Sequence, residues 1–112
     1  MKIAFTSTGP DWDADIDPRF GRTAFLLVYN EEKDEFEHYD NRDIENTAHG
    51  AGPRTAQKLF DFYADVLITG NGPGGNAGQV LEKAGIKVFA GAAGMSVKEA
   101  YHAYKSKELK MF

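Results

Sequence analysis

The chain has 112 residues, a formal net charge of −4 and no cysteine. This length predicts one domain over residues 1–112, and the lack of cysteine excludes disulfides, zinc ribbons and thiolate-bound iron–sulfur sites. The acidic balance argues against a nucleic-acid-binding protein. Because no apolar run is long enough for a membrane span or a signal peptide, we expect a cytoplasmic protein.

The first half of the chain predicts three strands. Lys2–Ser7 and Ala24–Tyr29 are mostly apolar, whereas Glu35–Tyr39 is more polar. The last two strands form a predicted antiparallel hairpin around the polar turn Asn30–Asp34. The polar stretch Asn41–Ala51 shows no clear period and is predicted to be a loop.

The second half alternates helices with the short buried strands Asp65–Thr69 and Ile86–Phe89. Each predicted helix has apolar residues spaced along one face. These faces are Ala56, Leu59, Phe60 and Tyr63; Ala77, Val80, Leu81 and Ala84; and Val97, Ala100, Tyr101 and Tyr104.

Cap residues mark the ends of these helices. Gly52 and Pro53 suit the cap and first turn of the first helix. Gly85 can end the second helix in the left-handed conformation. Ser96 and Glu99 form a predicted capping box for the third.

The order β-β-β-α-β-α-β-α predicts an α/β fold with a mixed five-stranded sheet, because parallel strands with helical crossovers follow an antiparallel hairpin. Nucleases of the ribonuclease H type share this order. The first strand, however, has no carboxylate for the two-metal chemistry of those enzymes. The glycine-rich loops are expected near the carboxyl ends of the strands, where ligands bind in such sheets.

The first candidate site is the loop Asp17-Pro18-Arg19-Phe20-Gly21-Arg22. Arginine presents a planar fork of donors that suits an anion. Asp17 could orient Arg19 or Arg22. The alternative is a loop stabilised by its own ion pairs.

The second candidate is His49 with Gly50 and Gly52. A neutral imidazole can bind a metal, and the glycines let a bulky ligand approach the backbone. The alternative is an exposed loop histidine. His38 and His102 are predicted to be structural, and the spacing of the three histidines gives no support for a zinc site.

The third candidate is the loop from Gly70 to Ala77, in which Gly72, Gly74 and Gly75 could bind an anion through backbone N–H groups. It lacks the Gly-Lys-Ser/Thr of a phosphate-binding P-loop, and its Gly-x-Gly-x-x-Gly pattern is a weak dinucleotide signal. Asn76 could bind the anion or simply cap the helix. No serine nucleophile motif and no evident acid–base pair indicate an enzyme.

Together these motifs resemble the dinitrogenase iron–molybdenum cofactor biosynthesis family of NifX-like, NifB C-terminal-like and NafY-core-like domains. The resemblance covers nearly the whole chain, from Asp17–Arg22 through His49–Gly52 and Ile68–Ala77 to the loop Gly91–Gly94. It implies a ribonuclease H-like three-layer fold without nuclease carboxylates. It also implies a noncatalytic metallochaperone that binds, carries or stores an anionic metal–sulfur cluster containing molybdenum with iron or copper, and that has cluster donor and acceptor proteins as partners.

On this hypothesis the chain binds neither nucleic acid nor a membrane, and its cluster brings its own sulfides. His49 is then the candidate metal ligand. Two alternatives stay open: an adaptor or regulator that keeps the fold without a metal, with the acids around Glu31–Glu37 as its contact surface, and an enzyme acting on a phosphorylated metabolite. The predicted cluster-binding residues are Arg19, Phe20, Gly21, Arg22, His49, Gly50, Gly52, Gly72, Gly74, Gly75 and Asn76.

Overall fold

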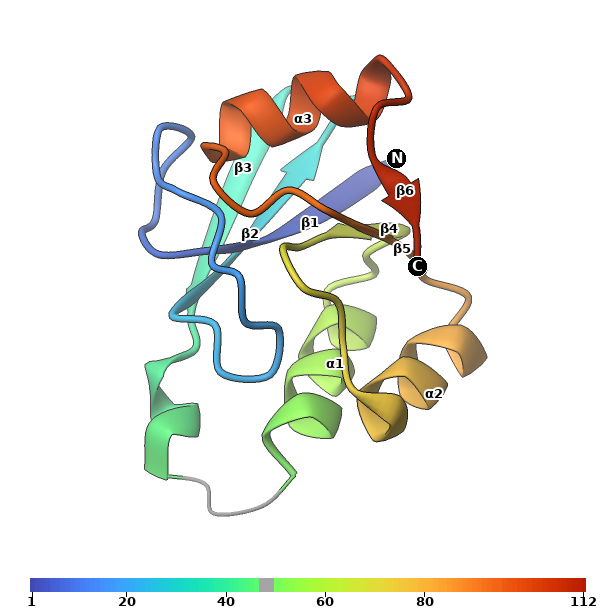
Figure 1. Ribbon diagram of the computed structural model, residues 1–112. Coiled ribbons are helices and arrows are strands. Elements are labelled where there is room, and N and C mark those ends of the chain that lie inside the picture. The colour runs from blue at the N-terminus through green and yellow to red at the C-terminus, as the bar shows by residue number, and fades with distance from the viewer. Residues whose placement is uncertain (47–49) are drawn as a thin grey trace.

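The computed structural model describes residues 1–46 and 50–112. The predicted order of strands and helices is confirmed (Figure 1), with a 3-10 helix inside the segment predicted as a loop and one further strand after the last helix. The elements are β1 (Lys2–Ser7), β2 (Phe25–Asn30), β3 (Glu35–Asp40), η1 (Arg42–Asn46), α1 (Ala51–Asp61), β4 (Val66–Ile68), α2 (Gly75–Lys83), β5 (Lys87–Ala90), α3 (Val97–Lys105) and β6 (Lys110–Met111).

The strands form one mixed sheet in the order β3-β2-β1-β4-β5-β6. Strands β1, β4 and β5 are parallel to one another, whereas β2, β3 and β6 pair with their neighbours in the antiparallel sense. The prediction of five strands was therefore wrong, because β6 is present at the edge beside β5. Its two residues are too few to show the alternation by which a strand is recognised in a sequence.

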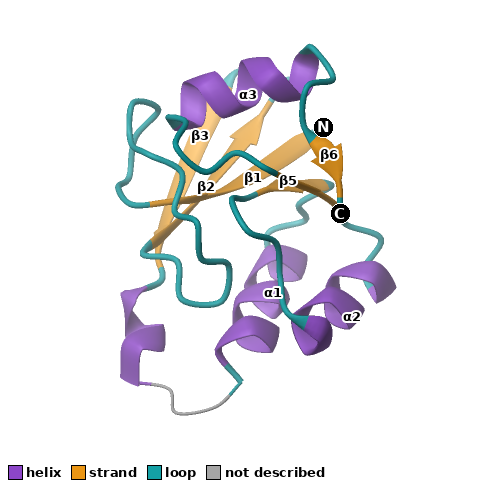
Figure 2. Ribbon diagram, viewed as in Figure 1, coloured by secondary structure: helices purple, strands orange, loops and turns teal. Residues whose placement is uncertain are grey.

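Helices α1 and α2 cover one face of the sheet and α3 covers the other (Figure 2), which confirms a three-layer arrangement. Side chains alternate between the faces of a strand. Ala4 of β1 accordingly packs in the cluster that contains Leu59 of α1 and Leu81 of α2, whereas Ile3 and Phe5 pack in the cluster beneath α3. Within the described part of the chain, no helix has the length and apolar character to cross a membrane.

The buried face of α1 differs from the predicted one. Phe60 and Tyr63 are 53% and 79% exposed, while Thr55 takes a buried place on the helix. The helix ends at Asp61, and Tyr63 follows it in the left-handed conformation with φ 61°. The apolar contact at this end is made instead by Phe62, whose ring stacks on Tyr39 with centroids 3.6 Å apart.

Candidate functional site

Three of the predicted segments meet through glycine contacts. A β-carbon at Gly21 would lie 2.8 Å from the backbone nitrogen of Gly52, so only glycine allows this approach. A β-carbon at Gly52 would in turn lie 3.1 Å from the β-carbon of Ala77. The arginine-containing loop and the first turns of α1 and α2 therefore touch with almost no side chain between them.

Backbone hydrogen bonds fix the arginine-containing loop to the sheet. The Asp17 N–H donates to the Thr6 carbonyl of β1 at 2.9 Å, and the Thr6 hydroxyl donates to the Asp17 carbonyl at 2.8 Å. The Asn71 N–H, from the loop after β4, donates to the Pro18 carbonyl at 3.0 Å. Gly70 allows this contact, since its β-carbon would lie 2.6 Å from the Pro18 Cα.

Asp17 pairs with Arg19 inside the loop, which is the ion pair that the alternative of a self-stabilised loop expects. Its carboxylate is 1% exposed and accepts hydrogen bonds from the Arg19 N–H, Nε and Nη2 and from the Ala24 N–H, at 3.0–3.1 Å. Burial acts to raise the pKa of Asp17. The hydrogen bonds and the charge of Arg19 outweigh this effect, with help from the Ala24 N–H, so the pKa lies below its usual value.

A buried polar chain that the sequence did not predict supports the turn at Gly21. The Thr55 hydroxyl donates to the Gly21 carbonyl at 2.8 Å, and the Asn41 amide donates to the Thr55 hydroxyl at 3.2 Å. Beside this chain, Arg22 donates from Nη1 to the Ile44 carbonyl of η1 at 3.3 Å. A threonine next to the apolar positions of α1 was the one local signal for this support.

These segments enclose a shallow hollow of about 420 Å³ that opens to solvent. Among the described residues that line it, none carries a carboxylate. The lining brings together most of the predicted site: Arg19, Gly21, Arg22, Ala51, Gly52, Pro53, Gly74, Gly75, Asn76 and Ala77.

The helices that begin at the hollow lack side-chain caps in the described structure. The N-caps of α1 and α2 are Gly50 and Gly74, and neither helix has a side-chain hydrogen bond at its N-terminus. Asn76 is therefore the second residue of α2 and not its cap. By contrast, α3 has the complete predicted capping box of Ser96 and Glu99. First-turn N–H groups have no partner within a helix and carry a partial positive charge, which favours an anion.

Three of the described predicted site residues do not line the hollow. Phe20 is buried in the core beneath α1 and α2, and Gly50 is the exposed N-cap of α1. Gly72 has φ +83° and lies under the ring of Phe112, which a β-carbon at Gly72 would meet at 2.6 Å. His49 lies outside the described residues.

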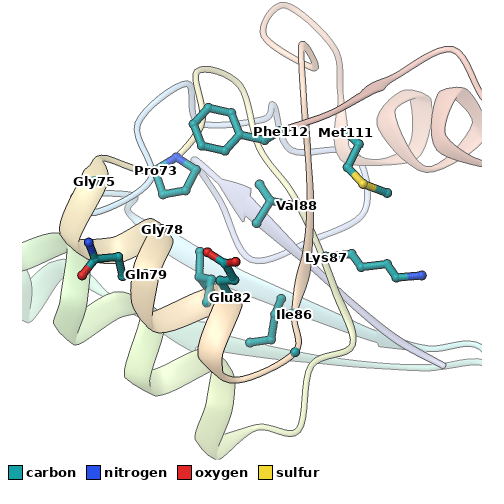
Figure 3. A pocket seen from close by; sticks show the side chains of 12 residues that line it. Pro73, Gly75, Gly78, Gln79, Glu82, Ile86, Lys87, Val88, Met111 and Phe112 are labelled. Carbon is teal, nitrogen blue, oxygen red and sulfur yellow. The ribbon is translucent and has the colours of Figure 1, made fainter.

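A larger cavity of about 600 Å³ lies between α2 and strands β5 and β6 (Figure 3). Figure 3 shows Phe112 and Pro73 together at one end, with Glu82 of α2 on one side and Lys87 of β5 on the other. None of the arginines lines this cavity, and aliphatic and aromatic side chains such as Ile86, Val88 and Phe112 supply most of its wall. The smaller hollow is therefore better suited to an anion.

The described residues contain no cluster of side chains that could bind a free metal ion. Among residues 1–46 and 50–112, no three histidine, aspartate or glutamate side chains are grouped closely enough to hold a metal ion, and the sequence has no cysteine. The hollow can instead hold an anion through guanidinium groups and backbone N–H groups. Any metal bound in this way would have to arrive within the anion.

Comparisons with known proteins confirm the resemblance. The model of the family described as dinitrogenase iron–molybdenum cofactor matches residues 1–107. The apo form of the orange protein from Desulfovibrio gigas is similar, with 38% identity and a TM-score of 0.93 over 99% of this chain and 92% of that one. A putative NifB protein from Thermotoga, assigned to the DUF35 family, has 32% identity and a TM-score of 0.81 over 98% and 91%. No curated protein matches the chain. The chain belongs to the dinitrogenase iron–molybdenum cofactor family.

Proposed function

We propose that the protein binds and carries an anionic metal–sulfur cluster in the hollow lined by Arg19 and Arg22, without catalysing a reaction. The observation that carries this proposal is the convergence of two arginines and two helix N-termini without side-chain caps on one hollow whose described lining contains no carboxylate. Such a surface favours negative charge and offers no acid–base pair for catalysis.

The cargo is a preassembled cluster with its own sulfides, because the chain has no thiol to supply sulfur. Molybdenum with iron or copper is its proposed metal content, which follows from the family. Charge-assisted N–H contacts to the cluster can be broken one at a time, so binding is reversible and suits transfer between a donor and an acceptor protein. No observation favours the adaptor hypothesis, and the ribonuclease H-like assignment of the fold stays a prediction.

His49 stays a predicted metal ligand on the sequence alone. It directly precedes Gly50, the N-cap of α1, and α1 begins at the hollow. A His49→Ala variant tests this role apart from the role of the arginines. If His49 binds the metal, the alanine variant should retain less cargo than the wild type at equal ionic strength. Equal retention would limit the site to charge and N–H contacts.

The central test is uptake of tetrathiomolybdate, an anion in which molybdenum carries four sulfides, alone and with copper or iron. Retained molybdenum is measured after desalting, together with visible absorption. Replacing Arg19 and Arg22 by glutamine should weaken binding by at least about tenfold per arginine, since each charged hydrogen bond contributes roughly 1.5–3 kcal/mol and 1.4 kcal/mol is tenfold. Binding should also weaken as ionic strength rises.

The matched control is Arg42→Gln. Arg42 forms the same kind of pair with Asp40 that Arg19 forms with Asp17, but it does not line the hollow. This control should bind as the wild type does. The proposal fails if the wild type retains no tetrathiomolybdate under any of these conditions, or if the folded double variant retains as much as the wild type.

A further inference from the structure

Two Asp-x-Arg pairs in this chain share one hydrogen-bond pattern. In each, Oδ1 of the aspartate accepts from the backbone N–H and the Nε of the arginine two residues later, and Oδ2 accepts from Nη2. The donor–acceptor distances are 3.0, 3.1 and 3.0 Å for Asp17 and Arg19. They are 2.9, 3.0 and 2.7 Å for Asp40 and Arg42.

The pairs differ in the burial of the aspartate. The Asp17 side chain is 1% exposed and that of Asp40 is 51% exposed, whereas the two arginine side chains are similar at 58% and 60%. Burying a carboxylate carries a large desolvation cost. Because the exposed pair forms the same turn without that cost, the turn itself does not require a buried aspartate.

Burial gives the Asp17 pair an attachment to the sheet. Oδ2 of Asp17 also accepts from the Ala24 N–H, just before β2, and the Asp17 backbone is bonded on both sides to Thr6 of β1. The guanidinium of Arg19 is therefore held by a carboxylate whose own position is set by two strands. Arg19 lines the hollow, and Arg42 does not.

We propose that Asp17 is a positioning residue that holds the Arg19 guanidinium at the hollow before the anionic cargo arrives. This inference rests on the proposed function. A long arginine side chain loses conformational freedom when it is fixed, and fixing it in advance removes that cost from binding. An arginine held on two of its nitrogens is already oriented when the cargo enters.

The effect of Asp17→Asn on cargo affinity distinguishes this proposal from charge repulsion alone, because the two predict changes in opposite directions. Asp17 is a negative charge beside an anion site, so if charge alone mattered, Asp17→Asn would strengthen cargo binding. If positioning matters, the same variant weakens it, because the asparagine amide cannot accept from Arg19 Nη2 and the Ala24 N–H as Oδ2 does.

The experiment is a double-mutant cycle with tetrathiomolybdate. We expect Asp17→Asn to weaken binding about five- to tenfold and Arg19→Gln about tenfold, with the double variant no weaker than Arg19→Gln alone. Asp40→Asn, in the exposed pair, should bind as the wild type does. Binding that is unchanged or tighter in folded Asp17→Asn overturns the proposal. A full further loss in the Arg19→Gln background also overturns it, because Asp17 would then act through the fold and not through Arg19.

The positioning of the Arg19 guanidinium can also be measured in the wild type, which requires neither a folded variant nor cargo. The Nε–H of Arg19 should exchange with solvent more slowly than the Nε–H of Arg42 in nuclear magnetic resonance spectra, because only the Asp17 carboxylate is buried. Equal exchange rates would show that Asp17 does not hold the guanidinium. A wild type that fails to bind tetrathiomolybdate but shows slow Arg19 exchange would refute the proposed function and leave the positioning intact.

Discussion

The glycines around the hollow differ in the space that a β-carbon would find at each position. At Gly21 the space for a β-carbon is already filled by the backbone of Gly52. At Gly74 and Gly75 of the hollow, and at Gly78 farther along α2, a β-carbon would by contrast meet nothing within 4 Å. Gly21 is thus needed for the segments to pack, whereas the glycines of α2 leave open space along the helix.

This difference predicts opposite effects of alanine at two positions. Gly21→Ala should destabilise the protein by about 1–3 kcal/mol, because its β-carbon would overlap backbone atoms that cannot rotate aside. Gly78→Ala should stabilise it by about 0.5–1 kcal/mol, because alanine favours a helix interior and has room there. Urea unfolding followed by Trp12 fluorescence measures both changes. A Gly21→Ala variant as stable as the wild type would contradict the close contact.

Helices α1 and α2, which begin at the hollow, have different N-caps from α3, which does not. Helix α3 begins with Ser96 and a reciprocal capping box, whereas α1 and α2 begin with glycine. A glycine N-cap is only a few tenths of a kcal/mol less favourable than serine or aspartate. The glycine caps therefore cost little stability and keep the first-turn N–H groups accessible.

The N-cap of α2 offers a direct test of this arrangement. Gly74 has an extended backbone, with φ −69° and ψ 174°, that any residue can adopt. Gly74→Asp should stabilise the helix by about 0.3–1 kcal/mol through its cap and the helix dipole. Its carboxylate should at the same time weaken tetrathiomolybdate binding about tenfold or more.

Gly74→Ser separates the two causes, because serine caps the helix without a charge. It should stabilise α2 in a similar way and weaken cargo binding less than aspartate does. Denaturation midpoints and cargo titrations are compared for both variants. If the aspartate variant bound cargo as tightly as the wild type, the N-terminus of α2 would not be part of the site.

The elements that the sequence predicted well depend on local signals. The strand Lys2–Ser7 is confirmed to the residue, and the capping box of α3 needs only the spacing of Ser96 and Glu99. Strand β6 was missed because two residues carry no period. The face of α1 was misjudged at Tyr63 because the helix ends at Asp61, before this position, and Phe62 makes the apolar contact instead.

The site was predicted where its chemistry lies within a short segment, as in the arginine-containing loop. Its support was not predicted, because Thr55 lies 34 residues from the Gly21 carbonyl that it contacts. The burial of Asp17 likewise depends on contacts with β1, which precedes it, and with Ala24 at the start of β2. Phe20 was assigned to the site because it stands between site residues, but its apolar ring belongs to the core.

For the molecule overall, the net charge of −4 conceals an uneven distribution. All four arginines lie between residues 19 and 54, while the segment 31–37 carries five acidic residues and one lysine. At the turn between β2 and β3, Glu31 accepts from Tyr101 and Lys105 of α3, which covers the face of the sheet opposite α1 and α2 (Figure 2). Local charge, and not the sum, therefore decides what the hollow attracts.

Acid should unfold the protein partly through Asp17, because this residue joins β1 to the start of β2. The pKa of Asp17 is lower in the folded chain than its usual value. Its ionised form thus contributes stability that is present above the unfolded pKa of about 3.9 and is lost as the pH falls through the folded pKa. Asp17→Asn should be less stable than the wild type at pH 7, and this difference should shrink below about pH 4. Urea midpoints between pH 7 and pH 3 would test this, and a constant difference would exclude the linkage.

The contact between Gly52 and Ala77 has a consequence for how cargo is exchanged. Because α1 and α2 touch where they begin, glycine, alanine and backbone atoms separate the two helices at the described part of the hollow. If the hollow carries the proposed cluster, the cluster would enter and leave through the side that opens to solvent. A receiving protein would then have only to cover that opening, and the rate of transfer would depend on how fast the cluster detaches from the arginines and N–H groups.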